Sequence, residues 1–260
     1  MDNNRTKFLN RRLKKIDPTI AKIFMPWILK NPKNLYTIMR LARAYRKTRM
    51  KRGEEMLENL KVPPFLILSI TSQCNLTCTG CYAAATRTLC DNKGSNSLNL
   101  EQWINIIEEA SELGVFGFII AGGEPFLMAN LLEISELFKD RLFLIVTNGT
   151  TLGEQEYKRL KHLKNTVIIV SIEGDQELTN LRRGSGVYEK VLSTINKLDE
   201  IGVICGISVT INRNNFKFWT ESKNIDDLIS KGVRLAFLLE YIPTDNDIEF
   251  MLTEIDCDLD

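Results

Sequence analysis

Short runs of apolar and β-branched residues alternate with longer amphipathic segments from residue 64 onward. The runs occupy 65–70, 116–121, 142–147, 167–172, 204–211 and 234–239, and apolar residues recur at helical spacing over 100–113, 131–138, 188–201 and 218–231. Runs of this length that are apolar on both sides are typical of strands in a buried parallel sheet. Strand–helix alternation repeated about six times predicts an α/β fold with right-handed crossovers. The periodicity does not distinguish a partial barrel from an open doubly wound sheet.

Residues 1–60 follow a different pattern. Prolines punctuate this region at 18, 26 and 32, and apolar residues recur at helical spacing between and after them. Residues 1–63 carry 17 Lys and Arg against 5 Asp and Glu, whereas the remainder carries 17 basic and 28 acidic residues. We predict a basic helical extension over 1–60 joined to an acidic body. Its simplest role is a cap that packs on the body, but the basic run at 40–52 also suits an anionic membrane surface or a nucleic acid.

Composition and the six cysteines narrow the class of protein. A chain of 260 residues with 44% hydrophobic content can bury a full core. Its start lacks the apolar stretch of a signal peptide, and no window reaches the roughly 18 uninterrupted apolar residues of a membrane span. We expect a cytoplasmic protein, with a peripheral membrane contact left open for the basic extension. In that compartment clustered cysteines are more often ligands or catalysts than disulfides.

The most unusual residues follow directly after the predicted strands. In both candidate architectures ligands bind at the carboxyl ends of the strands, so these residues converge on one rim. In strand order they are Cys74–Cys81, Gly122–Pro125, Asn148–Gly149, Glu173–Asp175, Asn212 and Glu240–Tyr241. This convergence predicts a functional site at the carboxyl edge of the sheet.

Three cysteines in one short loop, Cys74-x3-Cys78-x2-Cys81, are the strongest candidates for metal ligands. Soft thiolates suit an iron–sulfur cluster, zinc or copper(I). Structural zinc takes four ligands, usually from two paired knuckles, and only one short cysteine loop is present. Three thiolates on a four-iron cluster leave one iron open to a further molecule. We therefore predict a [4Fe–4S] cluster, with a zinc-stabilised scaffold as an alternative and Cys90 as a more distant fourth thiol.

These residues resemble the radical S-adenosylmethionine (radical SAM) superfamily, over roughly Pro64 to Tyr241. Members carry the same cysteine spacing in the loop after the first strand of a partial (βα)6 TIM-type barrel. Further motifs recur in order, at Gly122–Pro125, Thr147–Thr150, Ser171–Gly174 and Arg183–Tyr188. The resemblance implies a partial barrel here, with Cys74, Cys78 and Cys81 as the cluster ligands.

The resemblance also implies which residues bind S-adenosylmethionine. Gly122, Gly123, Glu124 and Pro125 match the segment that holds the methionine amino group. Asn148 matches the segment after strand three, and Ser171 and Glu173 match the position that bonds the ribose. Arg183 matches an arginine near the methionine carboxylate, although Arg182 beside it leaves that role shared between two candidates. Asp175, Asn212, Glu240 and Tyr241 also end strands, and we assign them no role.

Two features depart from the family pattern. Many members place an aromatic residue near the adenine just before the third cysteine, where this chain has Gly80. Tyr82, just after that cysteine, is the candidate replacement. Many members also have a glycine and an isoleucine in strand five, followed by an acidic residue. This chain lacks the acidic residue, and Ile204 is the remaining candidate for a contact with the adenine.

The implied function is reductive cleavage of S-adenosylmethionine at the cluster. The resulting 5′-deoxyadenosyl radical would abstract hydrogen from an unidentified small-molecule, peptide or lipid substrate, with electrons from a flavodoxin- or ferredoxin-like donor. A barrel interior lined by Ile119, Val146, Val170 and Val209 would exclude water. A nucleic-acid-associated modification module and a non-catalytic zinc scaffold are the alternatives.

The chain divides into a 1–60 extension, a 64–241 core and an acidic tail at 242–260. Many proteins similar to this one continue into a C-terminal extension with further cysteines for auxiliary clusters. The tail holds only Cys257, so we expect a truncated version of a longer chain rather than a compact single-cluster enzyme. Cys205 is expected to be a small buried residue. His162, the single histidine, is expected on the surface of a Lys-rich helix between strands three and four.

Overall fold

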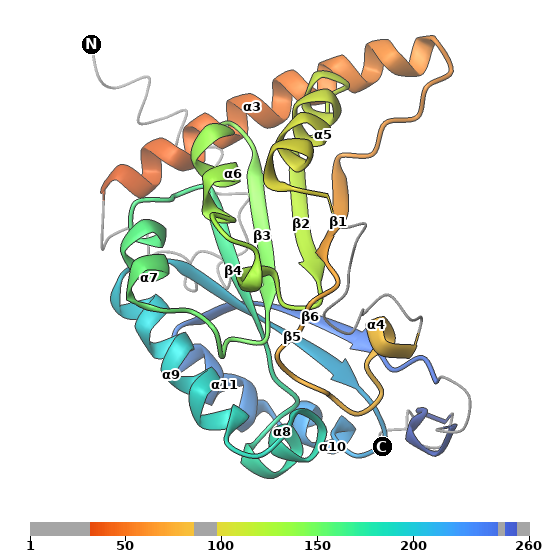
Figure 1. The fold of residues 1–260 in the computed structure, drawn as a ribbon, viewed down its shortest axis with the longest axis vertical. Coiled ribbons are helices and arrows are strands. Elements are labelled where there is room, and N and C mark those ends of the chain that lie inside the picture. The colour runs from red at the N-terminus through yellow and green to blue at the C-terminus, as the bar shows by residue number, and fades with distance from the viewer. Residues whose placement is uncertain (1–31, 86–97, 244–247, 254–260) are drawn as a thin grey trace.

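Six parallel strands form one sheet in the computed structural model, which describes residues 32–85, 98–243 and 248–253 (Figure 1). They are β1 Phe65–Thr71, β2 Gly117–Gly122, β3 Leu142–Thr147, β4 Thr166–Ser171, β5 Ile204–Ile211 and β6 Val233–Glu240. Their order in the sheet is their order in the chain, with β1 and β6 at the two edges. A doubly wound sheet would reverse its strand order at a switch point. The sheet is therefore a partial (βα)6 barrel, and the predicted fold class is confirmed.

Helices follow the strands and cover the outer face of the sheet (Figure 1). They are α5 Leu100–Glu112, α6 Leu132–Leu137, α7 Glu154–Leu160, α8 Gln176–Arg183, α9 Val187–Glu200, α10 Phe216–Thr220 and α11 Ser222–Ser230, with the short α4 Tyr82–Ala85 and the 3-10 turns η1 Pro125–Leu127 and η2 Ile248–Phe250. Local signals start several of them. Asn99 and Gln102 exchange side-chain and backbone hydrogen bonds of 2.9 Å at the start of α5. Asp175 accepts from the Leu178 amide and starts α8.

Two helix predictions were wrong in detail. The single helix expected at 218–231 is broken at Glu221, whose backbone is extended (φ −88°, ψ 112°). Side chains on both sides of the break have fixed partners: the Trp219 indole donates to the Glu173 carbonyl, and the Asn224 amide donates to the Phe218 carbonyl. Exposed His162 lies in a turn beyond α7, because the chain must reverse into β4 within a few residues.

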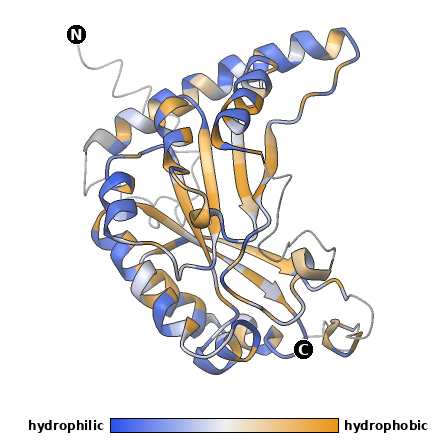
Figure 2. Ribbon diagram, viewed as in Figure 1, coloured by the Kyte–Doolittle hydropathy of each residue, from blue (hydrophilic) through white to orange (hydrophobic). Residues whose placement is uncertain are grey.

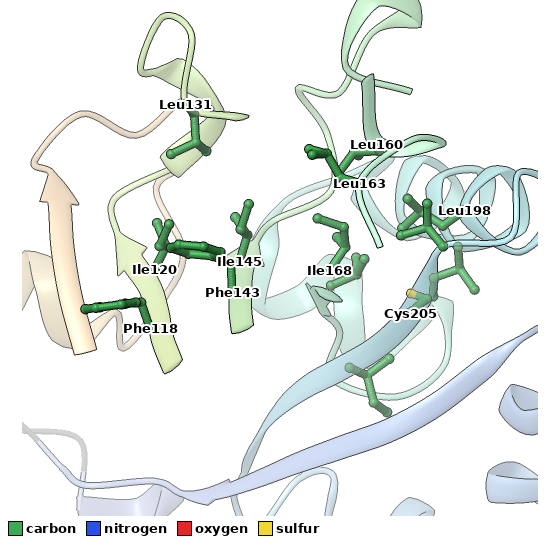
Figure 3. Packing of buried hydrophobic residues seen from close by; sticks show 14 of the residues in the cluster. Phe118, Ile120, Leu131, Phe143, Ile145, Leu160, Leu163, Ile168, Leu198 and Cys205 are labelled. Atoms are coloured by element: carbon green, nitrogen blue, oxygen red, sulfur yellow. The ribbon is translucent and has the colours of Figure 1, made fainter. Parts of the chain in front are cut away.

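Side chains on the outer face of the strands form the main core beneath the helices. Phe118 and Phe143 stack with their ring centroids 5.6 Å apart. Ile168 and Cys205 continue this layer on the next two strands, and both are fully buried (Figure 3). Burial of each large apolar side chain stabilises the fold by roughly 1.5–3 kcal/mol. Cys205 is thus the small buried residue that was predicted.

A second apolar cluster lies inside the barrel. It contains Leu144, Val167, Ile169, Ile119 and Val146. The expectation that Val170 and Val209 also line the interior was wrong, since both belong to the core beneath the helices. Successive side chains of a strand point to opposite faces, and Ile169, next to Val170, takes the inward position. Figure 2 shows the hydrophobic strands enclosed by helices with hydrophilic outer sides.

Helix α3, Pro32–Leu57, lies across the amino ends of the strands (Figure 1). The Arg52 guanidinium donates to the Gly114 carbonyl over 2.6 Å, and the Tyr45 ring meets Phe116 edge-on at 5.2 Å. This helix therefore packs on the body, as a cap would. The rest of the predicted extension, residues 1–31, lies outside the described residues. No described helix combines the length and apolar character that a membrane crossing requires.

Candidate active site at the carboxyl edge of the sheet

The loop from Ser72 to Cys81 leaves β1 at the carboxyl edge and ends at α4. Its three cysteines are unpaired and partly exposed. The loop is joined to the next strand at its start, because the Gln73 carbonyl accepts from the Glu124 amide over 2.7 Å. The two predicted motifs after β1 and β2 are therefore in direct contact.

The chemistry of the three thiols indicates what the loop can bind. Within the described part of the chain, no three His, Cys, Asp or Glu side chains converge as ligands of a single metal ion. Sulfurs that share a tetrahedral zinc would lie about 3.8 Å apart, given bonds of about 2.3 Å. Thiolates that each bind a different iron of a cluster must stand further apart. Three thiolates in one short loop are a donor set that fits an iron–sulfur cluster.

Burial and local charge act on two of the thiols. Burial raises the pKa of Cys74, and the negative charges of Glu124 and Cys81 raise it further. Burial also raises the pKa of Cys78, while the positive charges of Arg183 and Arg182 lower it. A metal that binds at this loop must displace the thiol protons, so iron uptake is expected to depend on pH.

Glu124 connects the loops that follow β2 and β3. Its carboxylate is fully buried and accepts from the Thr147 hydroxyl and the Asn148 amide, both over 2.7 Å, and from the Phe126 amide over 3.1 Å. Burial raises the pKa of this carboxyl, and the three hydrogen bonds oppose that rise. Pro125, also buried, starts the 3-10 turn that carries the chain away from the edge.

Gly123 lies against the cysteine loop with no room for a side chain. A Cβ there would stand 2.1 Å from the Gln73 carbonyl oxygen. Gly123→Ala is therefore expected to lower the free energy of unfolding of the cofactor-free protein by about 1–3 kcal/mol. Denaturant unfolding followed by circular dichroism measures this change.

Gly53→Ala is the matched control for that substitution. Gly53 lies in α3 with nothing within 4 Å of an added Cβ. The alanine there should stabilise the helix by about 0.5–1 kcal/mol. Equal changes in the two variants would contradict the close packing assigned to Gly123.

Asn148 holds the third loop of the rim against the cysteine loop. Its side-chain amide donates to Asn75 over 2.8 Å, and Asn75 in turn donates to the Thr150 hydroxyl over 2.9 Å. Because Asn148 also supplies a backbone amide to Glu124, the segments after β1, β2 and β3 form one hydrogen-bonded unit.

Glu173, Arg182 and Arg183 form a buried ionic cluster on the other side of the site. One oxygen of Glu173 pairs with both guanidinium groups over 2.6 Å, and the other accepts from the Thr210 amide over 3.3 Å. The side chains of Arg182 and Arg183 are only 14% and 10% exposed, so neither forms a surface ion pair. The two arginines that the sequence left unresolved thus share one partner.

The remaining predicted residues differ in how close they lie to the rim. Ser171 ends β4 at the rim and is buried. Tyr82 begins α4 beside the third cysteine, with 63% of its surface exposed. Ile204 is the first residue of β5 and packs inside the barrel, so it lies about 23 Å along the strand from the rim. The structure does not bring Ile204 to the site, because the pattern that suggested it begins the strand instead of ending it. Cys90 and Cys257 lie outside the described residues.

Residues 68–229 match the sequence model of the Radical SAM superfamily. The chain belongs to this superfamily. Its members are enzymes that use a [4Fe–4S] cluster and S-adenosylmethionine, so the predicted family, enzyme class and cofactors are confirmed.

Relatives of this radical SAM protein carry names that refer to different products. Fe-coproporphyrin III synthase of Methanosarcina barkeri is 29% identical over 59% of this chain and 38% of its own length. The sporulation killing factor maturation protein SkfB of Bacillus subtilis is 30% identical over 59% of this chain and 37% of its own. The solved structure of Streptococcus suis SuiB bound to S-adenosylmethionine has a TM-score of 0.65 at 17% identity, over 78% of this chain and 47% of SuiB. That likeness shows the fold, and the chain spans less than half the length of each of these three proteins.

A cavity of about 250 Å³ in the radical SAM protein lies beside the cysteine loop. Its walls include Gly80, Glu173, Arg182, Asn212, Asn215 and Tyr241. The sequence placed Asn212 and Tyr241 at strand ends without a role, and it gave no signal for Asn215. Position was the cue for Asn212 and Tyr241, which directly follow the last residues of β5 and β6.

Proposed function

We propose that this chain is the radical-generating core of an enzyme that cleaves S-adenosylmethionine and abstracts hydrogen from a substrate carbon. Bound and reduced, the cluster would supply the electron that splits S-adenosylmethionine into methionine and a 5′-deoxyadenosyl radical. The observation that carries the proposal is the placement of three free thiols in one loop, between the Glu124–Asn148 unit and the charged cavity. Cys74, Cys78 and Cys81 would hold the cluster.

The two sides of the cysteine loop offer different surroundings to the two halves of S-adenosylmethionine. We assign the methionine half to the side where Glu124 holds the turn at Gly122 and Gly123. We assign the adenosyl half to the 250 Å³ cavity, which is lined by Tyr241, Asn212 and Asn214 among other residues. A flat apolar wall with a few convergent polar groups suits a nucleoside.

A peptide is the substrate class that we favour. SkfB is named as a maturation protein for a killing factor, and SuiB has been solved with its precursor peptide SuiA. The barrel is open between β1 and β6, where Ile67 and Leu239 are 71% and 53% exposed. An open apolar side accommodates a long substrate more readily than a closed barrel does. Fe-coproporphyrin III synthase makes a small-molecule substrate the second choice.

Other partners remain part of the proposal. A flavodoxin- or ferredoxin-like protein would supply electrons in the cytoplasm. The exposed side chains of Arg43, Arg46, Lys47 and Arg49 on α3 favour an anionic surface near the amino ends of the strands. That basic face lies away from the cysteine loop, so an anionic partner there would position the enzyme without entering the site.

Anaerobic reconstitution with iron and sulfide, followed by dithionite and S-adenosylmethionine, tests the proposal. We expect 5′-deoxyadenosine, detected by chromatography, only when all three additions are made. A well-formed cluster that yields no 5′-deoxyadenosine, with or without candidate peptides, would contradict the proposed reaction. Failure to take up iron and sulfide would contradict the cluster assignment itself.

A further inference from the structure

The two neighbouring arginines of the ionic cluster differ in what else they contact. Arg183 directs two nitrogens, Nε and Nη2, to Glu173. Arg182 sends one nitrogen to Glu173 over 2.6 Å and another to the Gly80 carbonyl over 3.2 Å. Gly80 lies between the second and third cysteines, so Arg182 connects the segment after β4 to the last part of the cysteine loop.

The backbone of Arg182 makes a second contact with the same segment. Its carbonyl accepts from the Thr79 amide over 2.9 Å. Carbonyls in the last turn of a helix lack an intrahelical partner, and Arg182 stands in the last turn of α8. The end of α8 therefore bonds both residues that separate Cys78 from Cys81.

The segment Thr79–Gly80 is also confined from the opposite direction. Gly80 has a φ of +62°, and a Cβ there would stand 2.7 Å from the Tyr241 hydroxyl oxygen. With α8 on one side and the Tyr241 ring against Gly80, the segment cannot shift without breaking a contact. The distance between the Cys78 and Cys81 thiols depends on this short segment.

We infer that Arg182 is a positioning residue, which fixes Thr79–Gly80 and thereby the spacing of the two thiols that flank it. The inference rests on the proposed cluster at these cysteines. Arg183 shares the charge and the carboxylate partner of Arg182 but not its bond to the loop. Replacing a residue that orients a metal ligand, without itself binding the metal, typically changes metal affinity 10- to 100-fold.

Arg182→Lys tests the inference while keeping a positive charge next to buried Glu173. One ammonium on a flexible stem does not reproduce the fork that joins Glu173 to the Gly80 carbonyl. After anaerobic reconstitution, we expect the variant to lose iron to a chelator about tenfold faster than the unaltered protein. We also expect a changed electron paramagnetic resonance spectrum of the reduced cluster and a shifted midpoint potential, which loss of stability alone would not produce.

Two control variants separate the effect of the Arg182 bond to the loop from the effect of its charge. Arg183→Lys makes the same chemical change beside Glu173 without touching the loop, and Arg159→Lys alters a two-pronged ion pair with Glu136 elsewhere on the surface. Arg159→Lys should release iron at the unaltered rate with an unaltered spectrum, and Arg183→Lys should change both less than Arg182→Lys does. If Arg182→Lys behaves like Arg183→Lys in rate, spectrum and potential, the positioning role is wrong while the proposed function stands. If the unaltered protein binds no iron and sulfide, the proposed function fails and this inference with it.

Discussion

Glu173→Ala is expected to lower the free energy of unfolding by about 3–5 kcal/mol, since breaking a buried ion pair leaves charge without a partner. Two guanidinium groups, each less than 15% exposed, share this one carboxylate. The substitution also removes the acceptor of the Thr210 amide. Denaturant unfolding of the cofactor-free protein, followed by circular dichroism, measures the loss without interference from the cluster.

Glu136→Ala provides the comparison for that result. Glu136 also binds an arginine through two bonds of 2.8 Å, but its side chain is 41% exposed. Exposed pairs of this kind contribute at most about 1 kcal/mol. Glu173 also has more partners than Glu136, two guanidinium groups and a backbone amide against one guanidinium, so burial and the number of partners both predict the larger loss for Glu173. Similar losses for both variants would show that the Glu173 cluster is solvated in solution.

Cys78→Ala is expected to hold at least about tenfold less iron and sulfide than the unaltered protein after anaerobic reconstitution. Replacing residues that merely orient a metal ligand costs 10- to 100-fold in affinity, and loss of a ligand costs no less. Iron and acid-labile sulfide assays on the desalted protein measure the effect. The production of 5′-deoxyadenosine should fall with the cluster.

Cys205→Ala is the matched control for Cys78→Ala. Cys205 is fully buried on the outer face of β5, and burial raises the pKa of its thiol to about 12. The alanine should leave iron content unchanged and cost about 1 kcal/mol of stability. Equal iron content in the two variants would place the cluster ligands elsewhere.

The sequence predicted the fold and the rim because both depend on local patterns. Apolar runs located every strand to within one residue, and strand ends located the three cysteines, Glu124, Asn148 and Glu173. Periodicity left open the order of the strands, which depends on hydrogen bonds between distant segments. It also did not resolve which face each residue takes, so Val170 and Val209 were placed on the wrong side of the sheet.

The missed features of the site depend on contacts between distant segments. Arg182 and Arg183 are adjacent residues of the same type, so the sequence does not distinguish their roles. The structure shows that Arg182 donates to the Gly80 carbonyl. Tyr241 lies after the last strand, so nothing near the cysteines indicates that its ring packs there. Ile204 was chosen from the family pattern alone, although its predicted strand at 204–211 begins with it, at the end away from the rim.

The contact between Gly80 and Tyr241 limits how this protein can be engineered. A mutant library that varies the cysteine loop alone would find position 80 closed to larger residues, because the ring of Tyr241 already fills that space. Varying position 241 with it removes this steric block, although the φ of +62° at Gly80 still favours glycine. Paired randomisation of these two sites would therefore reach variants that single-site scanning discards, and related sequences should show the sizes of the two residues changing in opposite directions.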